Sequence, residues 1–338
     1  MSRRTTRKRP PRPAPKIPSP PRTGRRTARI AGALAGLVAV GFVAWLAFGR
    51  GEDWREKGRN DLAEGRAASA ERAWIRACRD RPSDPIPWRL RLELLRLEDR
   101  RPEARQVGRE ALASVPRSAR LDVLKALTLA LLADVPDDLA RSALRRFLDA
   151  DPLDADARVA LLRRIAADPR PGDPSPTDRL AALEDLARRE SHHRGAREAL
   201  VEALLDMGDP QAASERLEGW PAGDRDARYD RLAGRLALEH HRDPKEAVAL
   251  LGRASAAWPF DWSTRSALAR AYMASGDPEA ARREADAVAR LREILDPHTL
   301  GPRLDRDLAR PADPEARRDL ADLCERIGLE DLARAWRP

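Results

Sequence analysis

Apolar side chains recur along most of this chain at helical spacings, and no stretch alternates apolar and polar residues long enough to predict a strand. A longer period is superimposed on that spacing. Trp54 and Trp88, Ala70 and Ala104, Ala77 and Ala111, and Pro82 and Pro116 are each separated by 34 positions. This period holds two short helices and their turns. The pattern therefore predicts an all-α chain of stacked helix pairs over residues 52–338.

Each recurring residue has a packing role in such a helix pair. We expect Gly58 and Ala70 where the two helices cross, because larger side chains would push the backbones apart. Trp54 and Trp74 are expected to fill the space toward the next pair. Pro82 ends the second helix because it lacks an N–H donor. The equivalent residues of the second pair are Trp88, Ala104, Ala111 and Pro116.

Weaker copies of the pattern continue toward the end of the chain. They are marked by Ala140 and Pro152, Gly208 and Ala213, Ala247 and Pro259, and Tyr272, Gly276 and Ala281. We count roughly seven repeats on this basis. A shortened unit, from Leu320 to Trp336, follows the last full repeat and is expected to cap the stack.

The motif Trp54-x₃-Gly58, with Ala70-x₃-Trp74 and Pro82, resembles the tetratricopeptide repeat. The resemblance implies a right-handed α-solenoid that binds other proteins. Two positions depart from the family pattern: Asp61 stands where the family prefers Tyr, and Gly108 where it prefers a large aromatic residue. Every matching residue has a packing reason and none has a catalytic one.

Charge is distributed very unevenly along the chain. Residues 1–29 contain eleven Arg or Lys and no acidic residue, whereas the remainder has 53 basic and 55 acidic residues. The solenoid is therefore close to neutral despite the net charge of +9, and we expect no nucleic-acid partner. The tail also contains seven prolines, which predict a disordered, extended segment.

An uncharged stretch of twenty residues, 30–49, separates the tail from the repeats. As a helix it would span a hydrocarbon core of about 30 Å. The basic tail predicts a cytoplasmic N-terminus, which places the solenoid in the periplasm or its equivalent. The alternative is a cleaved signal peptide with a cleavage site near Ala47-Phe48-Gly49.

Two further hypotheses concern this N-terminal region. The tail is a candidate for binding anionic lipid, although its role in setting membrane orientation already explains its charge. Gly32-x₃-Gly36 makes one face of the predicted span compact, which would permit a homodimer.

Two proline-rich segments interrupt the repeats. Residues 168–178, DPRPGDPSPTD, predict a solvated, disordered loop, with a binding loop as the alternative. Residues 295–314 contain four prolines and are expected to separate the last full repeat from the terminal unit.

The sequence offers little chemistry beyond packing. Cys78 and Cys324 belong to the first and last repeats, so in an elongated stack they should lie far apart and buried. The pairs His192-His193 and His240-His241 are poor metal sites, because adjacent helical side chains diverge. We predict no catalytic residue, no metal and no cofactor, since no catalytic or phosphate-binding motif occurs.

A basic row is the candidate partner-binding groove. Arg55, Arg89 and Lys125 occupy equivalent positions on successive first helices, and Arg59 follows Arg55 by one turn. The row resembles a clamp that some family members use for a partner's carboxylate, for which Arg is suited by bidentate geometry. The alternative is a solvated face with no ligand.

The leading functional hypothesis is a single-pass, extracytoplasmic scaffold that mediates protein–protein interactions. The second is a biogenesis factor that holds unfolded or secreted clients near the translocon, and the third is an accessory subunit of a separately encoded envelope enzyme. An apolar groove would favour the client-holding factor, and a charged, patterned groove would favour the scaffold. The sequence does not name the partner protein.

Overall fold

The computed structural model describes residues 53–337, so the basic tail and the uncharged segment 30–49 lie outside the described residues. The chain divides into two units, residues 1–53 and 54–338, and the repeats form the second. Seventeen α-helices and no strand occur between residues 53 and 337, which confirms the all-α prediction. None of these helices is long and apolar enough to cross a bilayer.

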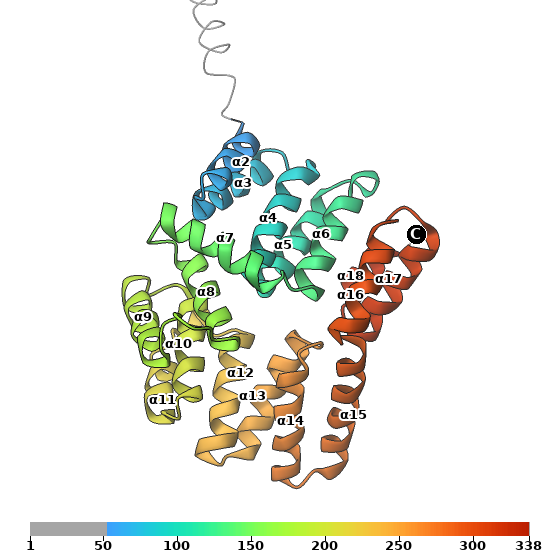
Figure 1. Ribbon diagram of the computed structural model, residues 1–338. Coiled ribbons are helices and arrows are strands. Elements are labelled where there is room, and N and C mark those ends of the chain that lie inside the picture. Colours follow the sequence, from blue (N-terminus) through green and yellow to red (C-terminus); the bar gives the residue numbers. More distant parts are fainter. Residues whose placement is uncertain (1–52, 338) are drawn as a thin grey trace, which may run out of the picture. The chain divides into compact units, whose positions relative to one another are not determined.

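The helices follow one another in antiparallel pairs (Figure 1). The first half contains α2 (Trp54–Ala63), α3 (Ala67–Asp80), α4 (Pro85–Leu97), α5 (Arg101–Ser114), α6 (Leu121–Leu132), α7 (Asp137–Ala150), α8 (Ala155–Ala167), α9 (Pro176–Arg189) and α10 (Arg194–Asp206). The second half contains α11 (Pro210–Glu218), α12 (Ala227–Leu236), α13 (Pro244–Ala257), α14 (Trp262–Ser275), α15 (Pro278–Ile294), α16 (Pro297–Leu308), α17 (Pro314–Arg326) and α18 (Glu330–Trp336). Short 3₁₀ turns occur at Arg117–Ala119 and Ala222–Asp224, and a π-helical turn at Ala237–His241 extends α12.

The predicted packing residues mostly take the expected places. The buried ones are Gly58, Ala70, Trp74, Trp88, Ala104, Ala111 and Ala247. A Cβ atom on Gly58 would lie 2.6 Å from Cδ1 of Trp74, so only glycine lets α2 approach that ring. Pro82 and Pro116 are exposed just beyond their helices, and Pro259 and Tyr272 are half-buried.

Trp54 departs from the prediction that it fills an inter-repeat space. Its ring is only half-buried and is flanked by the cationic groups of Lys57 and Arg76, at 5.3 and 4.6 Å from the ring centre. Trp54 begins the first described helix, and no repeat precedes it among residues 53–337.

The two departures from the family pattern have structural explanations. Asp61 is buried and accepts hydrogen bonds from Ser69 Oγ (2.9 Å) and from the Arg66 guanidinium, so it links α2 to the start of α3. Gly108 faces Leu127 of α6, where a Cβ atom would lie 2.9 Å from the Leu127 Cγ. Glycine therefore lets α6 pack closely on α5.

A left-handed residue recurs in the turn between the two helices of a pair. Positive φ angles occur at residues 65 and 99, which are 34 positions apart. They occur again at residues 208, 242 and 276, with the same spacing of 34 positions. Glycine supplies this conformation at 65, 208 and 276, because it lacks a Cβ. Asp99 and Arg242 adopt it as well, at φ 52° and 56°.

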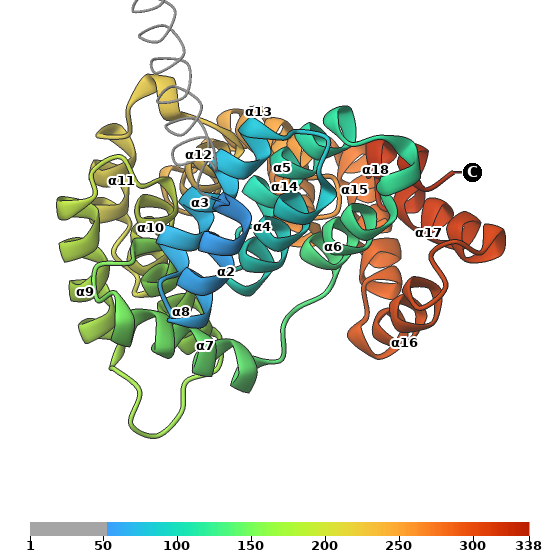
Figure 2. The same cartoon turned by 90° about the horizontal axis from the view of Figure 1, so that it is seen from above.

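The regular stack breaks between α6 and α7. Helix α6 packs on α4 and α5, whereas α7 packs on α8. One core cluster joins α3, α7 and α8 through Ala67, Ala70, Trp74, Leu144, Phe147, Ala157 and Ala160. Residues 133–136 connect the two helices in extended conformation, as Figure 2 shows. Two consecutive helices thus lie on different sides of the first repeats.

The two ends of the repeat unit meet and close it into a ring. Helix α18 packs on α6, and the fully buried indole of Trp336 donates a hydrogen bond from Nε1 to Thr128 Oγ1 (2.9 Å). A single core cluster contains residues of α3–α6 together with residues of α15–α18. Figures 1 and 2 both show α18 beside α6.

This closure corrects two predictions. The stack is not elongated, since Cys78 and Cys324 are buried in the same core cluster, where burial raises the pKa of both thiols to about 12. The terminal unit does not cap an open end, because its apolar residues are covered by the first repeats. The 34-residue period predicts contacts between neighbouring repeats. It carries no information about a contact between the first and last repeats.

The proline-rich segments are also more structured than predicted. The loop 168–178 is tied down by Arg141, which is almost fully buried and donates hydrogen bonds to Asp173 Oδ2 (2.7 Å) and to the Arg164 carbonyl (3.0 Å). Ser175 and Asp178 then form a capping box at the start of α9. Residues 297–308 form α16 with Pro302 inside it, rather than a simple break.

Candidate partner-binding cavity

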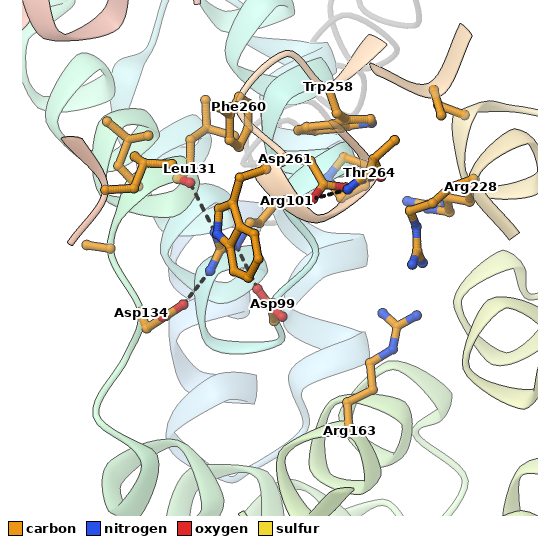
Figure 3. A pocket seen from close by; sticks show the side chains of 18 of the residues that line it. Asp99, Arg101, Leu131, Asp134, Arg163, Arg228, Trp258, Phe260, Asp261 and Thr264 are labelled. Carbon is orange, nitrogen blue, oxygen red and sulfur yellow. Dashed lines mark hydrogen bonds and ion pairs between the residues drawn. The ribbon is translucent and has the colours of Figure 1, made fainter. Parts of the chain in front are cut away.

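The ring encloses a cavity of about 830 Å³. One wall is apolar and consists of Trp258, Phe260, Trp262, Leu131, Leu132, Leu295, Leu300 and Leu304. A second part of the lining carries charges from three helices, namely Arg163, Glu198, Glu202, Arg228 and Arg231; this part is called the charged wall. Asp99, Arg101 and Asp134 also line the cavity, and Figure 3 shows Arg101 between the two carboxylates.

The aromatic wall is built by the turn between α13 and α14. The backbone reverses there because Asp261 caps α14, accepting hydrogen bonds from the backbone N–H groups of Ser263 and Thr264. Phe260 is buried and packs edge-on against Trp258, with ring centres 5.4 Å apart. Trp262 remains 38% exposed. Of the three rings of this turn, that of Trp262 is the one that the fold leaves most exposed.

The charged wall is a network of shared ion pairs. Glu198 of α10 accepts from Arg163 of α8 (2.7 Å) and from Arg231 of α12 (2.8 Å), and Arg163 also reaches Glu202 (3.2 Å). Burial by itself would raise the pKa of Glu198, but Arg163, Arg231 and Arg228 outweigh it and lower the pKa to about 2. The same carboxylates raise the pKa values of Arg163 and Arg231. Glu198, Arg163 and Arg231 therefore stay charged near neutral pH.

A second cavity of about 260 Å³ adjoins the first and shares Asp99, Pro102, Arg163, Glu198 and Arg228 with it. Its polar floor includes the carboxylates of Glu98 and Asp156, which lie with Glu71 within 4.8 Å of one another. The Arg100 guanidinium pairs with all three, at 2.7 Å from Glu71, 2.9 Å from Glu98 and 3.2 Å from Asp156. An arginine thus stands where a cation would bind, and the cluster is a buried ion-pair network.

His193 has a structural role at the edge of this second cavity. Its Nδ1 accepts a hydrogen bond from the backbone N–H of Ala196 (3.0 Å), which caps α10. Its Nε2 lies 3.0 Å from Asp156 Oδ1. Both ring nitrogens are therefore engaged within the fold, and His192 beside it is exposed.

The predicted basic row lies elsewhere. Arg55, Arg59, Arg89 and Lys125 lie on α2, α4 and α6, and none of them lines either cavity. Arg59 pairs with Glu56 (2.8 Å), and Arg89 pairs with Glu93 (3.1 Å). On the same side of α4, Arg96 Nε donates to the carbonyl of Ala133 (2.9 Å), which belongs to the segment between α6 and α7. That segment therefore contacts the C-terminal end of α4, seven residues beyond Arg89.

Sequence reasoning missed the residues of the cavity, although two signals were present. Three of the few aromatic residues in the chain, Trp258, Phe260 and Trp262, lie within five positions. Asp99 occupies the repeat position at which Gly65 stands 34 residues earlier. No feature of the sequence marked the ion pairs among α8, α10 and α12, because charged residues are abundant throughout this chain.

Two family models of the tetratricopeptide repeat (TPR) match the chain, one over residues 55–119 and one over residues 239–293. The chain therefore contains tetratricopeptide repeats. Both matches cover consecutive regular helices, α2–α5 and α13–α15. No curated protein sequence matches the TPR protein described here.

Two solved structures resemble the chain at low sequence identity. One is a chain of the APC/C hetero-tetramer Cut9–Hcn1, with 15% identity and a TM-score of 0.46 over 83% of the present chain. The present chain spans half the length of that one. Another is MamA protein, with 17% identity and a TM-score of 0.33. The matched region covers 48% of the present chain and 87% of the MamA chain.

The TPR repeats imply a general role for the fold. TPR repeats are scaffolds for protein–protein interaction, and the repeat fold is typically non-catalytic. The cavity is accordingly a candidate site for a segment of another protein.

The ion pairs of Glu198 predict an acid-sensitive contribution to stability. Its pKa of about 2 lies below the ordinary value of 4.5, so the contribution is complete above pH 4.5 and is lost as the pH falls toward 2. Replacing Glu198 with Gln should lower the free energy of unfolding at pH 7 by on the order of 2–3 kcal/mol. The difference from the wild type should shrink below pH 4.5. Urea unfolding followed by circular dichroism at several pH values measures it.

Glu184→Gln is the matched control, because Glu184 forms an exposed pair with Arg216 (3.4 Å). Its effect should stay within about 0.5 kcal/mol at every pH. A Glu198→Gln difference that is constant from pH 7 to pH 2 would contradict the assignment.

Proposed function

We propose that this TPR protein is a membrane-anchored, extracytoplasmic scaffold that holds a segment of a partner protein in the central cavity. The observation that supports the proposal most strongly is the cavity itself, about 830 Å³ with the exposed indole of Trp262 in one wall. Exposed aromatic surface in a concave site is typical of the anchors that dominate protein interfaces.

The charge pattern of the cavity favours a specific partner over many clients. Arg163, Arg231, Glu198 and Glu202 are held in fixed pairs at distances between 2.7 and 3.2 Å, apart from one still closer contact between Arg231 and Glu202. A factor that holds unfolded clients needs an adaptable apolar surface, whereas fixed charges reject segments that do not complement them. The client-holding function is therefore the second candidate. A role as accessory subunit of a separate envelope enzyme is compatible with the same cavity.

The proposed location rests on the sequence. Residues 30–49 carry no charge, and eleven basic residues precede them. Such an arrangement favours a signal anchor with the repeats outside the cytoplasm.

Protease treatment of spheroplasts tests this topology. We expect externally added protease to degrade the chain after Gly51 and to spare the N-terminal tail, because the bilayer shields residues 1–29. Protection of the repeats would contradict the topology, and a mature N-terminus near Arg50 would show that the segment is cleaved.

Photo-crosslinking tests the cavity as the binding site. A photoreactive phenylalanine analogue in place of Trp262 should crosslink to a discrete partner in native membranes, because this ring is exposed to the cavity. The same analogue at Met273 is the control, since Met273 is 61% exposed and does not line the cavity.

Mass spectrometry of the crosslinked bands distinguishes the candidate functions. A single partner protein crosslinked from position 262, with none crosslinked from position 273, would support the scaffold function. A broad series of secreted clients at position 262 would favour the client-holding factor, and identical patterns at both positions would contradict binding in the cavity.

A further inference from the structure

The first helix pair carries a basic surface on its exposed side. Four side chains of α3 are exposed, and they belong to Arg72, Arg76, Arg79 and Asp80. Positions 72, 76 and 79 fall on one face of the helix, because residues three and four apart are neighbours there. The three arginines and the aspartate together give a formal charge of +2. We call Arg72, Arg76 and Arg79 the basic face of α3.

The fold does not use the basic face for ion pairs. No carboxylate of residues 53–337 pairs with any of its three arginines. Glu71, the buried carboxylate of α3, pairs instead with Arg91 (3.2 Å) and Arg100 (2.7 Å). The basic face also lines neither of the two adjoining cavities. Its charge is therefore available to an external anion, on a surface separate from the candidate partner site.

Trp54 of α2 extends this surface. Its half-buried ring lies 4.6 Å from the guanidinium of Arg76 and 5.3 Å from the ammonium group of Lys57, measured from the ring centre. Figures 1 and 2 both show α2 beside α3, on which it packs. Tryptophan is enriched where proteins meet the membrane–water interface, and cationic side chains with long stems accompany it there. The combination is thus one that suits a lipid surface.

The chain connects this surface closely to the proposed anchor. Only residues 50–53 separate Trp54 from the uncharged stretch 30–49. Five residue steps reach at most about 18 Å, and the headgroup region on each side of a bilayer is about 5–8 Å thick. Under the proposed topology, Trp54 is therefore within reach of the headgroups. Residues 50–53 carry one basic and two acidic side chains, so they add no attraction of their own.

Charge alone would suit either an anionic lipid surface or an acidic protein. The short connection to the proposed anchor and the indole beside the cations favour lipid. Phospholipid headgroups offer phosphates to arginine and an interfacial layer to tryptophan.

We propose that Trp54 and the basic face of α3 bind anionic phospholipid headgroups beside the anchor and hold the repeat unit against the membrane surface. The proposal rests on the proposed membrane anchor and adds a second contact with the bilayer. It is distinct from lipid binding by residues 1–29, which lie on the other side of the bilayer under the proposed topology.

Fluorescence quenching of the full chain in lipid nanodiscs tests the proposal. The discs contain phosphatidylcholine brominated near the headgroup, with or without phosphatidylglycerol. The difference between each protein and its Trp54→Phe counterpart isolates Trp54 from the other tryptophans. We expect Trp54 to be quenched strongly only in the discs that contain phosphatidylglycerol. High salt should reduce this quenching, because it screens the charges of the surface.

Removing two arginines should abolish the contact. Arg72→Gln with Arg79→Gln should lower the ratio of bound to unbound surface by roughly 25-fold, because each arginine near an anionic surface contributes about fivefold. Quenching of Trp54 should then fall to its level without phosphatidylglycerol. Arg76 is kept, so the cation beside the ring is unchanged.

Arg282→Gln with Arg290→Gln is the matched control. Both arginines are exposed on α15, and neither pairs with a carboxylate of the described residues. This variant loses the same charge and should leave the quenching of Trp54 unchanged. Both double variants should melt at the temperature of the wild type, because exposed substitutions rarely change stability.

Three results would overturn the proposal. The first is equal quenching of Trp54 in the wild type and in the Arg72→Gln, Arg79→Gln variant, and the second is quenching that does not depend on phosphatidylglycerol. The third is a protein captured in native membranes by a photoreactive phenylalanine analogue at position 79, which would assign the face to an acidic partner. Protease treatment of spheroplasts tests the anchor independently, so failure of the lipid surface and failure of the proposed function remain distinguishable.

Discussion

The contact between Trp336 and α6 determines the architecture of the repeat unit. The indole donates to Thr128 Oγ1, whose hydroxyl in turn donates to the Leu124 carbonyl within α6. In an open solenoid each repeat is supported only by its neighbours. Here the first and last repeats share one core, so the stack is closed and the inner surface becomes a cavity. The candidate site exists because the ends meet.

The break between α6 and α7 gives the cavity a further charged residue. Helix α6 remains on α4 and α5, α7 joins α3 and α8, and the extended connection between them brings Asp134 into the cavity. Arg96 and Arg164 hold that connection by donating to the carbonyls of Ala133 (2.9 Å) and Val135 (3.3 Å). The irregular segment is therefore fixed by side chains of the regular helices, and it places Asp134 opposite Asp99 across Arg101.

Much of the fold could be predicted from the sequence, but the site could not. The 34-residue period gave the helix pairs and most of the packing residues, because contacts within and between adjacent pairs depend on local spacing. Ring closure depends on residues about two hundred positions apart, such as Thr128 and Trp336, and no periodic pattern reports that contact. The predicted basic row on α2, α4 and α6 lines neither cavity, and its role in partner binding stays a prediction. The cavity combines residues of several repeats, so its charges could be grouped only in three dimensions.

Hydrogen exchange of the full chain tests ring closure most directly. Replacing Trp336 with Ala should accelerate amide exchange in α6, because it removes the buried contact with Thr128, while Arg334→Ala on the exposed side of α18 should leave α6 unchanged. Faster exchange in both α18 and α6 after Trp336→Ala would support the closed ring. Acceleration confined to α17 and α18, with α6 as protected as in the wild type, would contradict it.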